Sequence, residues 1–268
     1  MVLQILGRQR LKNHTVYNSP ELVDSFNFLN TTIPIVFSHA SYLTATGAAL
    51  LRNSNQYVST CPESEVFSSI NHPLHENFQD QTALGVDGQS DWSADIVTQA
   101  RLWLGKLREV EYTKVNDDFH VPKNSAMSVN QAFLLATRHG GLALRREDLG
   151  IIAVGAKADL VVFDGDSPGM LGWLDPVEAV IQHSNVGDVE HVIVNGKFVK
   201  RHFKLSVKEY DSIKRRFVRS ARRIQKLWKE IPYPVLEGLF LGVSEYATAE
   251  TVDTLRGPGD GVGEPNLS

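Results

Sequence analysis

The sequence has little cysteine, no excess of positive charge and no long apolar run. Its one cysteine, Cys61, excludes a disulfide within the chain and is typical of a reducing compartment, so we expect a cytoplasmic location. The 27 Lys and Arg are outnumbered by 31 Asp and Glu, which argues against a nucleic-acid partner because no basic excess is available to neutralise phosphates. No uninterrupted apolar run of ~18 residues occurs, so neither a membrane span nor a membrane partner is expected.

Size and composition are those of an ordinary globular protein. The chain has 268 residues, of which 42% are hydrophobic and 22% are charged. This length is enough for one large domain or two modest ones with a sizeable core.

The first 110 residues alternate short β-branched apolar runs with helical patterns. The predicted strands are residues 33–38, 56–60 and 83–86. The predicted helices are residues 43–51, 73–81 and 93–110, the last with Ser93 as its N-cap. Strands that alternate with helices in this way indicate a parallel α/β organisation.

The rest of the chain is richer in strand signals. A helix is predicted from Ser128 to His139, ended by Gly140-Gly141. Strands are predicted at 160–163 and 192–194, and Asn195-Gly196 is typical of a type I′ hairpin. The Gly- and Pro-rich tail from residue 257 is predicted to be disordered.

A basic amphipathic helix is predicted from Val207 to Lys229. Its basic residues are compatible with an acidic partner or a membrane surface. We favour the more ordinary interpretation, a helix that packs on the protein and presents a solvated face.

Four segments carry a resemblance to a known family. They are Phe37-Ser38-His39 with Leu43-Thr44, then LGVDG at 84–88, then AFLLATRHGG at 132–141, and finally Gly150 with VGAKADLVVFD at 154–164. In this order they resemble the C-terminal portion of the amidohydrolase superfamily, in its cytosine-deaminase, guanine-deaminase and chlorohydrolase-like branch. The pair of strands around VIVNGK at 192–197 is similar to the small β domain of that family.

The resemblance implies an α/β fold. We expect a partial (β/α)8 barrel of the TIM type, with about the last three strand-helix units, and a small β-sandwich-like domain. The expected divisions are barrel residues 1–148, small β domain 149–206, C-terminal helix and extension 207–256, and disordered tail 257–268. In such barrels the site lies at the C-terminal ends of the strands.

Two residues at predicted strand ends are the main site candidates. By resemblance, Asp87 ligates a metal ion and accepts a proton from the metal-bound water, whereas its alternative role is to cap the turn before Gly88. His39 is similar to a histidine that contacts the substrate or attacking water in some members and the metal in others. Its alternative role is that of a hydrogen-bonded histidine at a strand end.

The loop after the second predicted strand supplies further candidates. Glu63 and Ser64 are expected to contact the substrate, or else to form a plain turn. Cys61 is not expected to be a nucleophile because no histidine partner is evident. His72 and His75 have a spacing similar to that of metal ligands, but a role at the start of a helix is favoured.

Some expected metal ligands are missing. The family binds its metal, most often Zn and in some members Fe, through a His-x-His pair and a histidine on the fifth strand, and this sequence contains no His-x-His. His14 is the nearest candidate for the fifth-strand ligand. We therefore expect either a fragment or a naturally shortened chain that is weakly active or inactive alone.

The resemblance implies a hydrolase of non-peptide C–N bonds that uses a metal-activated water. Its substrate would be a small molecule with an amide, amidine or ring-amino group, and a homo-oligomer is possible. The alternative is a truncated, non-catalytic relative that serves as a binding or interaction module.

Overall fold

A computed structural model describes most of the chain. The described residues are 3–6 (backbone only), 20–40, 43–67, 78–88, 93–233, 235–240, 244–248 and 250. Among them, none of the helices combines the length and apolarity that crossing a bilayer requires.

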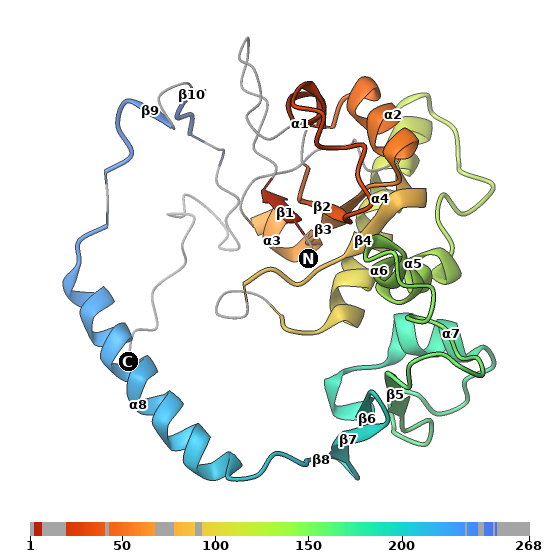
Figure 1. The fold of residues 1–268 in the computed structure, drawn as a ribbon, viewed down its shortest axis with the longest axis vertical. Coiled ribbons are helices and arrows are strands. Elements are labelled where there is room, and N and C mark those ends of the chain that lie inside the picture. Colours follow the sequence, from red (N-terminus) through yellow and green to blue (C-terminus); the bar gives the residue numbers. More distant parts are fainter. Residues whose placement is uncertain are drawn as a thin grey trace.

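A parallel sheet of four strands forms the N-terminal part (Figure 1). The strands lie in chain order as β1 (Leu3–Leu6), β2 (Ile35–Ser38), β3 (Tyr57–Thr60) and β4 (Thr82–Leu84). Each strand pairs in parallel with the next. The carboxyl ends of all four therefore share one edge of the sheet. About three strand-helix units were predicted, with residues 1–7 as a possible remnant of the strand before them or of its loop, and β1 shows that this remnant is a strand.

A helix follows each strand of the sheet, but the sequence predicted only the second and the fourth of them, and the third stands where a loop was expected. These helices are α1 (Pro20–Ser25), α2 (Ala45–Ser54), α3 (Pro62–Phe67) and α4 (Ile96–Asp117). The helix predicted at 73–81 lies mostly outside the described residues, and its described end is a short 3₁₀ helix, η2 (Gln79–Gln81). Thr44 caps α2 by accepting a hydrogen bond from the Gly47 N–H. The predicted cap of α4, Ser93, is wrong. Asp95 is the N-cap, because its carboxylate accepts hydrogen bonds from two N–H groups of the first turn.

The core of this region lies between the sheet and its first two helices. Phe37 of β2, Val58 of β3 and Leu51 of α2 are completely buried there. Gln56 is buried beside them, where its amide donates to the Leu29 carbonyl and accepts from the Ile35 N–H. These hydrogen bonds hold the starts of β2 and β3 together, and so help to position the segments that follow the two strands.

The helix predicted from Ser128 to His139 is two helices. α5 (Val129–Ala136) begins with a capping box between Ser128 and Gln131, as expected for this start. The chain then bends at Thr137 (φ −129°, ψ −85°) and α6 (Arg138–Ala143) includes the glycines that were predicted to end the helix. A Cβ at Gly141 would lie 2.7 Å from the Leu149 carbonyl oxygen, so this glycine serves close packing rather than termination.

A second, antiparallel sheet follows in the order β5-β6-β7-β8. Its strands are β5 (Leu160–Phe163), β6 (Val189–Val194), β7 (Lys197–Arg201) and β8 (Lys204–Leu205). Asn195 and Gly196 have positive φ angles of 47° and 78°, which confirms the predicted type I′ turn. Val161 remains 52% exposed, and no second layer covers this sheet among the described residues. The sandwich therefore stays a prediction.

The two sheets are joined through α4, α5 and the segment α7 (Pro176–Glu178) with η3 (Ala179–His183). Trp103 of α4, Leu135 of α5 and Ile181 of η3 belong to one buried cluster. Arg101 reinforces the junction by donating to the carbonyl oxygens of Ile181 and Ser184 at 2.9 and 2.7 Å.

Two further elements follow β8. α8 (Tyr210–Glu230) extends from it, apart from the helices around the parallel sheet (Figure 1). A short hairpin of β9 (Leu239–Phe240) and β10 (Ser244–Glu245) comes after it. None of the α8 residues is buried, so the expected packing of its apolar face on the protein is wrong for the described chain.

Candidate functional site

His39 and Asp87 converge at the carboxyl edge of the parallel sheet. His39 directly follows β2, and Asp87 lies three residues after β4. The distance from His39 Nε2 to Asp87 Oδ2 is 3.9 Å. The strands β2 and β4 are not neighbours in the sheet, because β3 lies between them. The side chains therefore meet across the end of β3.

Both residues have an unusual backbone conformation. The φ angle is +65° at His39 and +61° at Asp87, in the left-handed region that few residues with a Cβ adopt. Such positions cost on the order of 1–3 kcal/mol each and cluster at functional sites. The backbone of the two site residues therefore shares a conformation that is uncommon for residues with a side chain.

Helix α3, which follows β3, holds Asp87 in place. Ser64 Oγ donates a hydrogen bond of 2.6 Å to Asp87 Oδ2. Gly85 permits the close approach of the β4 end to β3, because a Cβ there would lie 2.8 Å from Ser59 Oγ and 2.9 Å from Cys61 Sγ. Of the two residues predicted to contact substrate, Ser64 is thus part of the His39–Asp87 cluster.

Glu65 is a member of the site that the sequence interpretation missed. Its side chain is completely buried and lies 3.3 Å from His39 Nδ1. The same carboxylate accepts hydrogen bonds from Thr60 Oγ1 at 2.8 Å and from the Cys61 N–H at 2.9 Å. The sequence did offer a signal for Glu65, because it is a second glutamate that directly follows Pro62-Glu63-Ser64 at the end of a predicted strand. Glu65 therefore fixes the ring of His39 from the side opposite Asp87.

Two pKa values at the site depart from their ordinary values. The hydrogen bond that His39 Nδ1–H donates to Glu65 raises the pKa of His39 above its ordinary value; burial opposes the shift, and the charges of Glu65 and Asp87 add to it. Burial, with the same two charges, raises the pKa of Cys61 to about 12. A thiol that stays protonated is a poor nucleophile, which agrees with the expectation for Cys61.

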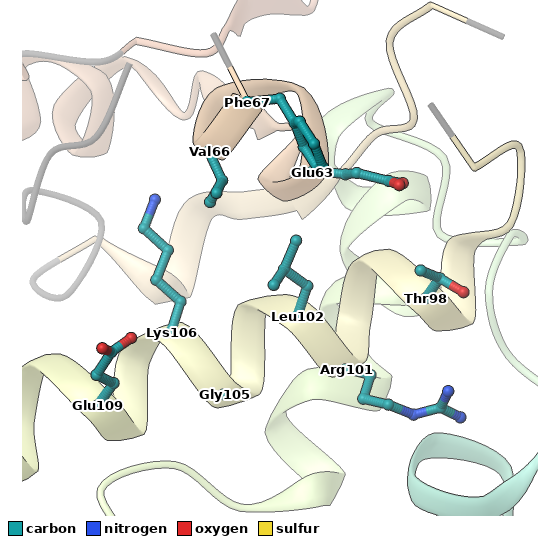
Figure 2. Close-up of a pocket in the computed structure, with 9 residues that line it drawn as sticks. All are labelled: Glu63, Val66, Phe67, Thr98, Arg101, Leu102, Gly105, Lys106 and Glu109. Carbon is teal, nitrogen blue, oxygen red and sulfur yellow. The ribbon is translucent and has the colours of Figure 1, made fainter. Parts of the chain in front are cut away.

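Glu63 lies at a different place. Its carboxylate accepts hydrogen bonds from the Ser93 N–H at 2.9 Å and from Gln99 Nε2 at 2.8 Å, which ties α3 to α4. Figure 2 shows it at one end of a hollow of about 740 Å³ between these helices, with Phe67, Leu102 and other residues of both helices along it. Neither His39 nor Asp87 lines this hollow. The role of Glu63 in binding a substrate stays a prediction.

His39 and Asp87 offer two facing donors for a metal ion. Their 3.9 Å separation is slightly wider than that of two ligands bound at ~2.0–2.2 Å to one zinc ion. Catalytic zinc usually needs three protein ligands, and the part of the chain that the structure describes does not bring a third to this pair. His14, His72 and His75 lie outside the described residues.

A group of three possible ligands occurs elsewhere, in the antiparallel sheet. It consists of Glu190, His191 and His202. The His202 N–H donates to His191 Nδ1 at 3.1 Å, so a neutral His191 carries its proton on Nε2, which faces Glu190 Oε1 at 3.2 Å. A histidine that binds a metal normally uses one ring nitrogen as the ligand and donates a hydrogen bond from the other. Here both ring nitrogens of His191 already have hydrogen-bonding partners. This group is therefore arranged as a hydrogen-bonded cluster.

Comparison with known proteins gives consistent results. A model of the amidohydrolase family matches residues 12–199. The 5-methylthioadenosine/S-adenosylhomocysteine deaminase of Moorella thermoacetica is 29% identical over 183 residues, which cover 66% of this chain and 40% of that protein. The 5′-deoxyadenosine deaminase of Methanopyrus kandleri is 30% identical over 102 residues, 38% of this chain and 24% of that protein.

Solved structures share the fold. An adenosine deaminase from Xanthomonas campestris with bound zinc superposes with a TM-score of 0.65 at 21% identity, over 79% of this chain and 46% of that one. A guanine deaminase from C. acetobutylicum with bound guanine gives 0.57 at 16% identity, over 74% and 48%. This likeness indicates that β1–β4 and their helices are part of a TIM-type barrel. The chain spans less than half the length of the curated relatives it matches.

Proposed function

The chain belongs to the amidohydrolase family, and from this premise we propose that it is part of a metal-dependent hydrolase of non-peptide C–N bonds. The observation that supports the proposal most is the convergence of His39 and Asp87. They come from different strands of a parallel sheet, at the edge where barrel enzymes carry their sites. Their strained backbones and the buried Glu65 behind His39 indicate a preorganised cluster.

Asp87, and His39 beside it, would hold the metal ion. A bound Zn²⁺ lowers the pKa of a coordinated water from ~15.7 to ~7 and so supplies a nucleophile at neutral pH. Zinc is the favoured metal because the similar adenosine deaminase structure contains it, and Fe remains the second candidate.

The side chains around the proposed metal site would have separate roles. With a metal bound, Asp87 would accept a proton from the attacking water and pass it to the leaving amine. Ser64 limits the movement of the Asp87 carboxylate, because it donates a hydrogen bond of 2.6 Å to Oδ2. His39, held by Glu65, offers Nε2 to the water or the substrate.

The names of the relatives support one substrate class. The two relatives compared above are named as deaminases of adenosine derivatives, and one structural neighbour is a guanine deaminase. We therefore favour a small molecule with a ring-amino group over an amide or amidine. Glu63 is retained as a candidate substrate contact at the α3–α4 hollow.

The chain alone is expected to be weakly active or inactive. Two donors bind zinc less firmly than the usual three. β1 and β4 are the outer strands of the described sheet, so neither is closed into a barrel there. The exposed edges also favour self-association or a partner. The second candidate function, a non-catalytic binding module, is favoured by the same open sheet.

Zinc dependence and ammonia release together test the two functions. The chain and its Asp87→Asn variant are incubated with excess zinc and 5′-methylthioadenosine or guanine, and ammonia is measured. Slow zinc-dependent release that falls on the order of 10²-fold in Asp87→Asn supports the hydrolase. Zinc binding at Asp87 without any release supports the non-catalytic module. Release that is equal in both variants contradicts a role for Asp87.

A further inference from the structure

α8 carries one apolar face that is exposed to solvent. Ile213, Phe217, Ile224 and Trp228 recur at spacings of four, seven and four residues, which places them on one side of a helix. Phe217 is 69% exposed and Trp228 is 64% exposed. Tyr210 and Leu227 extend the same face. A large apolar face of this kind is stable only against a covering surface.

The opposite face of α8 is cationic. The sequence YDSIKRRFVRSARRIQKLWKE contains eight Lys and Arg but only two acids, Asp211 and Glu230, one near each end. The helix therefore has a formal charge of +6 (eight minus two) within a chain of net charge −4. The charge of this one element is opposite in sign to that of the molecule.

Along most of the helix the cations have no acid nearby, because Asp211 and Glu230 are within four residues only of cations near the two ends. Arg215 with Arg219, Arg219 with Arg223, and Arg222 with Lys226 are four residues apart, the spacing at which like charges destabilise a helix. A surface helix that only needs to stay solvated usually intersperses both signs. An anionic covering surface would relieve this repulsion.

Exposed apolar residues continue after the helix ends. Ile231 is 63% exposed and Tyr233 is 98% exposed, and Val235 and Leu236 follow them. This segment is not helical. The covering surface must therefore accept a helix and several irregular residues beside it, which a groove shaped for one helix does not do.

We propose that α8 docks in the plane of an anionic lipid bilayer, with its apolar face in the acyl boundary. A helix with Lys and Arg on one side and Trp, Phe and Leu on the other has the composition of an interfacial helix. Cations near the boundary of the two faces, such as Lys214 and Arg216, meet the headgroups. The proposal departs from the expectation of no membrane partner, which rested on the absence of a spanning segment.

Other occupants satisfy only one of the two faces. A second copy of α8 would cover the apolar face but bring two helices of charge +6 together. A nucleic acid would pair with the cations and leave Phe217 and Trp228 in water. An anionic bilayer offers both an apolar layer and negative charge, and the attraction is worth ~1 kcal/mol per Lys or Arg near the surface.

Vesicle cosedimentation tests the proposal. The full chain is mixed with vesicles of phosphatidylcholine alone, or with about 30% phosphatidylserine, at about 0.1 M salt. We expect binding to the anionic vesicles to be at least ~10-fold stronger, and to weaken when salt is raised to about 0.5 M. A lane without vesicles subtracts any protein that sediments by itself.

Matched variants connect the binding to α8. Phe217→Gln with Trp228→Gln should lower binding at least ~10-fold, because the apolar anchors are lost while helix propensity is kept. Phe119→Gln is the control, because Phe119 is 99% exposed outside α8, and binding should not change. Circular dichroism checks that all variants keep their helix content.

Several results would overturn the proposal. They are no binding to anionic vesicles, equal binding to both vesicle types, or unchanged binding in the Phe217 and Trp228 variant. Binding to calmodulin, an acidic protein that accepts basic helices, without binding to vesicles would also overturn it.

Discussion

Ser64 Oγ lies 2.6 Å from Asp87 Oδ2 and donates a hydrogen bond that joins α3 to the loop after β4. The same oxygen of Asp87 faces His39 Nε2 at 3.9 Å. Ser64 therefore sets the position of the oxygen that we propose binds the metal. Hydrogen bonds of this kind, made to a ligand rather than to the metal, commonly tune metal affinity.

Ser64→Ala should weaken zinc binding more than it weakens the fold. The 43% exposure of the Asp87 side chain limits the loss of unfolding free energy to about 1 kcal/mol or less. Zinc affinity should fall ~10-fold or more. Urea unfolding and a zinc titration measure the two effects. Ser25→Ala is the control, because that residue is exposed and its hydroxyl donates to the Leu22 carbonyl within α1. Equal zinc affinity in both variants would remove Ser64 from the site.

The His39–Glu65 pair should make stability depend on pH. The pKa of His39 in the folded chain is raised above 6.5, mainly by Glu65. Its contribution is therefore fully present below about pH 6.5 and is lost as the pH rises through the folded pKa. Urea unfolding in the presence of a chelator, repeated across this window, should show stability falling as pH rises.

Glu65→Gln isolates this contribution from that of the other histidines. The variant keeps the size of the side chain and removes its charge. The pKa of His39, followed by NMR of its ring protons, should fall towards the ordinary value, and the stability curve should flatten. A His39 titration that is the same in both proteins would show that Glu65 does not control the ring.

Cys61 should be inert in the folded chain. Its pKa of about 12 leaves almost no thiolate at pH 8, and the side chain is buried. Iodoacetamide should therefore label the thiol at least ~100-fold more slowly in buffer than in urea, as measured by mass spectrometry. Equally fast labelling in buffer would mean that the end of β3 opens readily.

Local signals predicted much of the fold. The β-branched runs gave β2, β3 and β4 to within about two residues, and the Asn195-Gly196 turn was predicted correctly, because each depends on adjacent residues. The errors at α4 and α5 have a different origin. Asp95 competes with Ser93 for the same cap, and the bend at Thr137 has no distinctive residue to mark it.

The site was only partly predictable because its contacts join distant residues. His39 and Asp87 stand at strand ends, where the resemblance places functional residues. Glu65 is 26 residues from His39 in the sequence, and nothing in either local sequence predicts the hydrogen bond between them. The exposure of α8 was also missed, since a sequence shows an amphipathic pattern but not what covers it.

Zinc binding at His39 is the most direct test of the proposed metal site. The ring proton of His39 is followed by NMR during a zinc titration of the chain, with His191→Gln and His202→Gln introduced to remove the separate cluster. The account predicts that zinc shifts or broadens the His39 signal, that dialysis reverses the change, and that Asp87→Asn abolishes it. A His39 signal that does not respond to zinc, or that responds equally in Asp87→Asn, would contradict it.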